Sequence, residues 1–298
     1  MTKRTDLPLI LLIAAVLVGC IAFGGGYTGN LVVWMSIAAV MAASLRFVLL
    51  IGELNFATAA FFGIGAYCTG YIVNYLEWPF LLTLAASTIL ALLVSVVFGC
   101  ITLRVKGPYF LLIGFAFTEA MRILYSRTDV LGGNSGLVGI FPPEWLDAYY
   151  QYFVTILSFG LITAMWFVER SNLGKVFIAI RDNENVVRSV GIPVFMTKVL
   201  CFAVASAVAG LAGSVHAYAN NVISPLDFGF MLSTFALAYL KVGGEDSPLG
   251  PVIGAVLLVG IASYAQTLGG NEHILYGLAI IVSVLFLPKG LMGLFKSR

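Results

Sequence analysis

The chain has 298 residues, of which 60% are hydrophobic and only 10% are charged, and its mean hydropathy is +1.02. This composition excludes a soluble globular protein, because too few polar side chains are present to cover a water-exposed surface. The net charge is only +2, and the sequence has no cluster of basic residues, so no nucleic acid is predicted as a partner. The lipid bilayer is the environment that the composition favours.

Ten apolar segments are predicted to cross the bilayer as helices. A span needs roughly 20 apolar residues to cross about 30 Å of hydrocarbon. The segments cover residues 7–23, 31–51, 54–76, 79–103, 108–125, 150–168, 199–219, 228–242, 249–268 and 274–287. They are about twice as long as a membrane-spanning strand, and their hydrophobicity does not alternate. The sequence therefore predicts an all-α integral membrane protein with about ten transmembrane helices, in one transmembrane domain over residues 1–298.

Lysine and arginine residues fall almost entirely on one side of this arrangement. Only Arg122 and Arg127 lie on the other side. The remaining cationic residues are Lys3, Arg4, Arg46, Arg104, Lys106, Arg170, Lys175, Arg181, Arg188, Lys198, Lys241, Lys289, Lys296 and Arg298. Because positive residues mark the cytoplasmic side of a membrane protein, both termini are predicted to lie in the cytoplasm.

The longer outer connection covers residues 126–149. It is rich in glycine and then contains Pro142 and Pro143, which is typical of an ordered surface loop. Two interpretations stay open. The loop either covers the bundle as a solvated cap or forms a docking face for a partner outside the cytoplasm.

The inner connection, residues 169–198, contains clear helix signals. Asp182 or Asn183 can cap a short helix, Arg188 lies in its last turn, and Gly191 follows as a stop signal. An apolar face is predicted from Val186, Val187 and Val190. Such a helix either docks on a cytoplasmic partner or packs against the inner ends of the bundle.

No enzyme motif is present in the sequence. There is no GxxxxGK[ST] phosphate loop and no GxSxG nucleophile motif, so the chain is not expected to hydrolyse ATP itself. His216 and His273 are far apart, and the four cysteines are scattered without CxxC spacing, so neither a metal site nor a cofactor is predicted. No catalytic residues are assigned.

A weak internal repeat relates the two halves of the chain at a shift of 172 positions. The shift aligns residues 54, 56, 66, 67 and 79 with identical residue types at 226, 228, 238, 239 and 251. In the ten-span arrangement these residues belong to spans three and four and to spans eight and nine, which run in opposite directions. The pattern indicates an inverted repeat of five plus five helices, and transporters built in this way pass their substrate where paired helices are interrupted.

Three polar residues near the interrupted spans have no evident partner in the sequence. They are Asn55, Thr58 and Asp227, and we predict that they line the substrate pathway. The alternative is that they cap helices, because Asn55 and Asp227 lie near the start of a span. Glu119 and Arg122, by contrast, can pair on one helix face and are expected to be structural.

Several motifs resemble the M-type (LivM-like) permease subunits of branched-chain amino-acid ABC importers. They are GELNFATAAFFGIGAY at 52–67, LRVKGPYF at 103–110, LGGNSGL at 131–137, AIRDNE at 179–184, AGLAG at 209–213, ISP at 223–225 and LGP at 249–251. The resemblance extends over about residues 45–258. Where the family usually has Gln, Ser, Gly and often His, this chain has Glu53, Asn55, Ala57 and Thr58.

The resemblance implies a multi-pass protein of the bacterial inner membrane with several partners. These are a second permease of the H type, two cytoplasmic ABC ATPases and a periplasmic solute-binding protein. In the family, the loop that corresponds to residues 169–198 docks on the ATPase. The resemblance therefore implies coupling roles for Arg181, Asp182, Glu184, Arg188 and Gly191.

The expected function is that of a permease subunit of an ATP-driven importer. Branched-chain amino acids are the first candidate solutes, while urea or short amides and aromatic carboxylates stay open. The alternative function is a self-contained secondary transporter or channel, which would be expected to contain a buried ion-coupling acid. A membrane scaffold or enzyme has no motif in its favour.

Overall fold

The computed structural model describes residues 6–23, 26–105, 107–267 and 290–296, and single positions between 274 and 285. The chain forms two compact units. Unit 1 contains Met1–Arg46, Ala148–Phe167 and Thr234–Arg298, and unit 2 contains Phe47–Asp147 and Val168–Ser233. Most of the predicted tenth span, 274–287, lies outside the described residues, as do five of the predicted inner charges: Lys3, Arg4, Lys106, Lys289 and Arg298.

Unit 1 consists of apolar helices. They are α1 (Asp6–Phe23), most of α2 (Gly26–Leu49), most of α7 (Tyr150–Arg170), most of α11 (Phe230–Gly243), α12 (Gly250–Thr267) and α14 (Gly290–Lys296). Polar contacts connect residues that are far apart in the sequence: Arg46 Nε donates to the carbonyl of Glu245 over 2.9 Å, and Tyr27 hydrogen-bonds Ser263 over 2.5 Å.

Unit 2 contains the residues for which a function was predicted. Its main helices are α3 (Thr58–Tyr71), α4 (Phe80–Thr102), α5 (Pro108–Arg127), α8 (Asn172–Asp182), α9 (Glu184–Ser189) and α10 (Val194–Asn220). Its shorter elements are the π-helical turn η1 (Ile72–Leu76), the 3₁₀ turns η2 (Asp129–Leu131), η3 (Gly133–Ser135) and η4 (Pro225–Phe228), the helix α6 (Glu144–Asp147) and the strands β1 (Leu137–Val138) and β2 (Val222–Ile223). The strands pair antiparallel, with Leu137 opposite Ile223.

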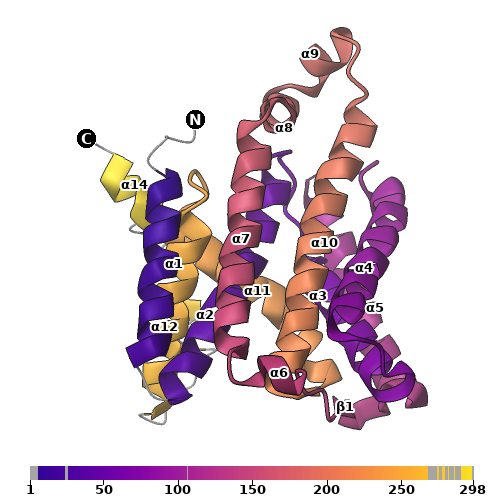
Figure 1. The fold of residues 1–298 in the computed structure, drawn as a ribbon. Helices are drawn as coiled ribbons and strands as arrows, with labels where there is room; N and C mark the ends of the chain where they lie inside the picture. The colour runs from indigo at the N-terminus through magenta and orange to yellow at the C-terminus, as the bar shows by residue number, and fades with distance from the viewer. Residues whose placement is uncertain are drawn as a thin grey trace. The chain divides into compact units, whose positions relative to one another are not determined.

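The core of unit 2 lies where α10 packs against α3 and α4 (Figure 1). Small residues allow these backbones to approach closely. A methyl group at Gly65 would overlap the carbonyl of Gly210, and one at Gly213 would overlap that of Phe62. A buried hydroxyl group on each helix completes the contact, because Thr69 hydrogen-bonds both Ser87 and Ser214. Close glycine contacts and interhelical hydroxyl bonds are typical of membrane bundles.

The helical class predicted from the sequence is confirmed. Within the part of the chain that the structure describes, five helices, α2, α4, α5, α7 and α10, are long and apolar enough to cross a membrane by length and composition. Shorter apolar stretches occur at Pro8–Ala22, Phe230–Gly243 and Gly250–Ala265. The count of ten spans and the orientation of the termini stay predictions.

Two helices are shorter than the predicted spans that contain them. Both α3 and α11 have 14 residues, about 21 Å at 1.5 Å per residue, and α3 continues directly into the π-helical turn η1 as far as Leu76. The predicted third span began at residue 54, but the helix begins only at Thr58, after a non-helical segment that we call the α3 break, residues 50–57. The bounds of α3 and α11 coincide at the same 172-residue shift that relates the two halves of the sequence.

Candidate functional site

The α3 break is a turn built from its own polar side chains. Gly52 has a φ of 84°, a left-handed conformation that follows the end of α2 and that glycine adopts without strain. Asn55 accepts a hydrogen bond from the backbone N–H of Ala57 over 2.9 Å, and Thr58 donates to the carbonyl of Asn55 over 2.9 Å. Both side chains are buried. The expectation that Asn55 and Thr58 lack partners is therefore wrong, because both stabilise the local turn.

Neighbouring helices hold the break in place. The carbonyl of Phe56 accepts hydrogen bonds from Thr118 on α5 and from Ser233 on α11. Ser233 also accepts a hydrogen bond from the backbone N–H of Ala59. The carbonyl of Phe56 and the N–H of Ala59, which the missing helical turn leaves without helical partners, are satisfied in this way.

A second break, residues 224–229, precedes α11. Asp227 accepts a hydrogen bond from the backbone N–H of Ser224 over 2.9 Å, and the Ser224 side chain completes a capping box around η4. Asp227 is exposed, and its carboxylate also has a local partner, contrary to expectation. Glu119, paired with Arg122 over 2.7 Å as expected, accepts a hydrogen bond from the first backbone N–H of α11.

Two buried tyrosines lie beside this second break. The rings of Tyr67 and Tyr125 stack with centroids 4.0 Å apart, and the ring of Phe228 contacts both edges. Both tyrosine hydroxyls are buried without a hydrogen-bond partner. An unpaired buried hydroxyl is unfavourable, and the hydroxyl of Ser206 in unit 2 is a third such group. Sequence reasoning had not assigned them a role.

The inner connection contains two helices rather than the single helix that was predicted. Here α8 ends at Asp182, and Asn183 caps α9 by accepting from the backbone N–H groups of Asn185 and Val186. The sequence had left Asp182 and Asn183 as alternative caps, and the geometry selects Asn183. The stop signal is confirmed, because Gly191 follows α9 with a φ of 84°.

The predicted apolar face of α9 is only partly correct. Val187 is buried in a small cluster with Ile180 and Val194. Val186 and Val190 point away from it and are 59% and 73% exposed. Val190 lies beyond the last residue of α9, Ser189, and only Val187 packs against the neighbouring segments. The two exposed valines leave the outer face of α9 free of intrachain packing.

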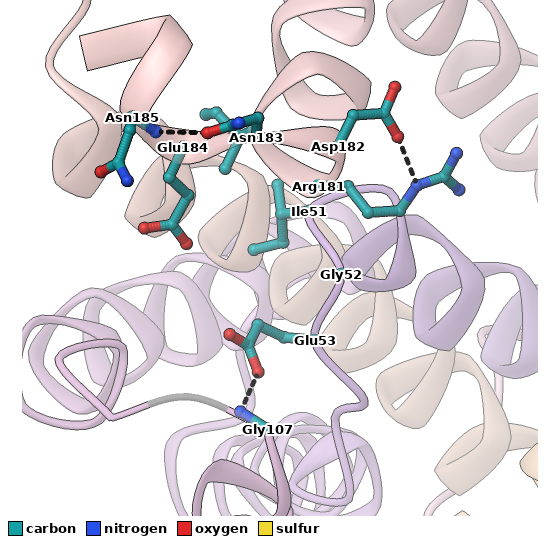
Figure 2. Close-up of a pocket in the computed structure, with 10 residues that line it drawn as sticks. Ile51, Gly52, Glu53, Gly107, Arg181, Asp182, Asn183, Glu184 and Asn185 are labelled. Atoms are coloured by element: carbon teal, nitrogen blue, oxygen red, sulfur yellow. Dashed lines mark hydrogen bonds and ion pairs between the residues drawn. The ribbon is translucent and has the colours of Figure 1, made fainter.

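A cavity of about 380 Å³ separates the α8–α9 connection from the α3 break (Figure 2). It is lined by Ile51, Gly52, Glu53, Gly107 and residues Ile180 to Asn185. Three of the predicted coupling residues, Arg181, Asp182 and Glu184, therefore meet the break at one site. Arg188 and Gly191 do not line the cavity. Arg181 and Asp182 form an exposed ion pair over 3.5 Å, and Arg188 is exposed.

The charge centre of this site was missed by sequence reasoning. Lys198, in the first turns of α10, forms ion pairs with Glu184 and with Glu53, the latter over 3.6 Å. Glu53 also accepts a hydrogen bond from the backbone N–H of Gly107 over 3.0 Å. Burial raises the pKa of the Glu53 carboxyl, although the Gly107 hydrogen bond and the Lys198 charge both lower it. A lysine just inside an apolar helix was the available signal, but its two partners are far away in sequence.

No metal site is apparent in this region. Among the residues that the structure describes, no group of three or more His, Cys, Asp and Glu side chains is arranged to hold a metal ion. The chemistry of the site is that of ion pairing and of hydrogen bonding to backbone groups.

Comparison with known families identifies the chain. The family model described as "Branched-chain amino acid transport system / permease component" matches residues 27–287. The chain belongs to this family. The match extends over both structural units and includes the two breaks, the cavity and the α8–α9 connection.

The sequence identity to individual relatives is low. The chain is 25% identical to the high-affinity branched-chain amino acid transport system permease protein LivM of Escherichia coli K12, over 83% of this chain and 65% of that protein. It is 21% identical to the probable LivM permease of Methanocaldococcus jannaschii, over 71% and 68% of the two chains. It is also 22% identical to the ribose import permease RbsC of E. coli K12, over 80% and 79%. The chain thus spans slightly less than two thirds of the length of the E. coli LivM protein.

No solved structure matches the chain significantly.

Proposed function

We propose that the chain is the transmembrane permease subunit of an ATP-driven ABC importer for small polar or amphipathic solutes. The observation that carries this proposal is the family match over residues 27–287. Branched-chain or related amino acids are the proposed solutes, because two of the relatives named above carry that substrate in their names. The ribose permease among the relatives is the reason to test sugars as well.

The proposed assembly contains a second permease of the H type, two cytoplasmic ABC ATPases and a periplasmic solute-binding protein, in the bacterial inner membrane. ATP hydrolysis is assigned to those partners, because the sequence contains no phosphate loop. We propose one permease domain with about ten spans, both termini in the cytoplasm, residues 126–149 in the periplasm and an inverted repeat of five plus five helices. The equal bounds of α3 and α11 under the 172-residue shift support the repeat.

Within the chain, we propose two functional regions. The α8–α9 connection is the coupling region, with Arg181, Asp182, Glu184, Arg188 and Gly191 as its residues. The outer face of α9, which the exposed Val186 and Val190 leave unpacked, supports a docking role. The two breaks are the proposed pathway region, with Asn55, Thr58 and Asp227, because short interrupted helices are where such transporters bind their substrate.

Co-purification and reconstitution test the proposal. The chain is co-expressed with the permease, ATPase and binding-protein genes beside it, and the complex is placed in vesicles. We expect two ATPases to co-purify and L-leucine uptake to require ATP and the binding protein. Uptake of a sugar instead of L-leucine would change the proposed solute but would leave the proposed importer function in place. Uptake by the chain alone, driven by an ion gradient, would favour a secondary transporter.

A further inference from the structure

We infer that Lys198 is a positioning residue that couples movement of α9 to the α3 break. The inference rests on the proposed function, because it assigns a route from the coupling region to the pathway region. It starts from an unusual placement. The Lys198 side chain is only 3% exposed, and it lies between two carboxylates from segments that are far apart in the chain.

The two carboxylates belong to different parts of the site. Glu184 is the first residue of α9, and its side chain extends from α9 into the space above Glu53 (Figure 2). Glu53 lies in the α3 break, and its other oxygen accepts the hydrogen bond from Gly107, the residue before α5. One ammonium group therefore connects α9, α10, the α3 break and the start of α5.

Burial makes this connection stiff. The Glu53 and Lys198 side chains are 5% and 3% exposed, and Glu184 is 16% exposed, so water cannot readily replace a lost partner. A buried charge that loses its partner is strongly unfavourable. When α9 shifts, Glu184 and Lys198 are therefore expected to stay together and to alter the position of Glu53. A surface ion pair such as Arg181 with Asp182 would simply separate.

The surroundings allow such a movement. The cavity of about 380 Å³ lies beside Glu53 and Glu184, so the segments on its two sides are not packed tightly together. Residues 53–57 of the α3 break belong to no helix, and Gly52, with its left-handed φ of 84°, marks the bend after α2. Asn55 and Thr58 follow Glu53 within the same turn. A displacement of Glu53 thus reaches the proposed pathway residues directly.

Hydrogen exchange of the assembled complex tests the inference without a known solute. The complex with its partner permease and ATPases is studied in lipid nanodiscs, with and without ATP plus vanadate. In the wild type we expect deuterium uptake to change in peptides from both 184–190 and 50–57. In Glu184→Gln, the change at 184–190 should persist and the change at 50–57 should be lost. Glu53→Gln should behave in the same way, and Lys198→Arg should retain both changes.

A matched variant controls for the loss of a carboxylate. Glu245→Gln removes one carboxylate from the partly buried pair with Lys241, which lies outside the coupling region and the α3 break, and should leave both changes at the wild-type level. The inference is wrong if 50–57 does not respond in the wild type, or if it still responds in Glu184→Gln. The proposed function fails as well if 184–190 shows no response to nucleotide in the wild type. A failure of the inference alone leaves the response at 184–190 intact, so the two failures are distinguishable.

Discussion

Single charged residues dominate the energetics of the site in unit 2. Glu53, Glu184 and Lys198 place two negative charges around one positive charge, largely out of water. Such a group is stable only while its hydrogen bonds and pairs are complete. Removing Lys198 would leave two carboxylates facing each other, so Lys198→Met should cost about 3–5 kcal/mol, the usual range for an orphaned buried charge. Removing one carboxylate leaves a simple ion pair and should be tolerated.

The raised pKa of Glu53 predicts a pH dependence of stability. The folded state binds the Glu53 proton more tightly than the unfolded state does, so ionisation of this group lowers stability as the pH rises through the unfolded and then the folded pKa. Glu53→Gln removes this loss. Its melting temperature relative to wild type should therefore be higher at about pH 8 than at about pH 5, as measured by thermal unfolding in detergent. A trend of the opposite sign for Glu53→Gln would contradict the prediction.

Asp227 allows capping and pathway roles to be separated. Asp227→Asn keeps an oxygen that can accept the Ser224 hydrogen bond but removes the charge. If the carboxylate contributes to solute passage, uptake per folded molecule should fall at least about tenfold, which corresponds to about 1.4 kcal/mol. Uptake is measured in vesicles and normalised to inserted protein, with Asp246→Asn at the exposed residue of the α11–α12 turn as the control. Wild-type uptake by Asp227→Asn would assign the residue to capping alone.

At the level of helices, close glycine contacts determine how α3 and α10 pack. Gly65 lies directly against the backbone of Gly210, whereas Gly160 on α7 has open space where a methyl group would be placed. The same substitution should thus have opposite consequences at the two positions.

Gly65→Ala should destabilise unit 2 by about 1–3 kcal/mol, because the added methyl group forces two helices apart. Gly160→Ala should be neutral or stabilise slightly, since alanine is the better helix former and nothing is displaced. The fraction that remains monodisperse after heating in detergent provides the measurement. Equal effects of the two variants would show that the close approach of α3 and α10 is not required.

The charge of α9 provides a test of the coupling region. Glu184 is unsuitable for a charge reversal, because its partner Lys198 is buried and the variant would be expected to unfold. Arg188 is exposed on the same helix, so Arg188→Glu should reduce ATP-dependent uptake at least about tenfold without loss of folded protein. Lys175→Glu makes the same reversal on the exposed side of α8 and should retain uptake. Normal uptake by Arg188→Glu would favour a purely structural role for α9.

At the scale of the whole molecule, the distribution of charge predicts the topology. Asn134 is exposed in the predicted outer loop, and Asn185 is exposed in the inner connection. Asn185 is a better labelling position than Asn183, whose side chain caps α9.

In a variant without the four native cysteines, Asn134→Cys should react with an impermeant thiol reagent from outside the cell. Asn185→Cys should react only after the membrane is made permeable, because the excess of positive residues predicts a cytoplasmic inner connection. Labelling is read by a mass shift on a gel. The reverse pattern would overturn the ten-span topology.

Patterns along the chain were sufficient to predict the membrane environment, the helical class and the family. Lipid requires long apolar helices with satisfied backbones, and this requirement appears directly in composition and segment length. Local signals also predicted the end of α9 at Gly191 and the pair of Glu119 with Arg122, because these depend on residues only a few positions apart.

Only the tertiary structure decided which polar residues act together. Asn55, Thr58 and Asp227 seemed unpaired in the sequence, yet each has a local partner once the chain turns. The Glu53, Lys198 and Glu184 group could not be predicted, because burial and proximity depend on how α9, α10 and the α3 break pack together. The length of an apolar segment predicts a membrane helix, but the partner of a buried charge is determined by three-dimensional contact.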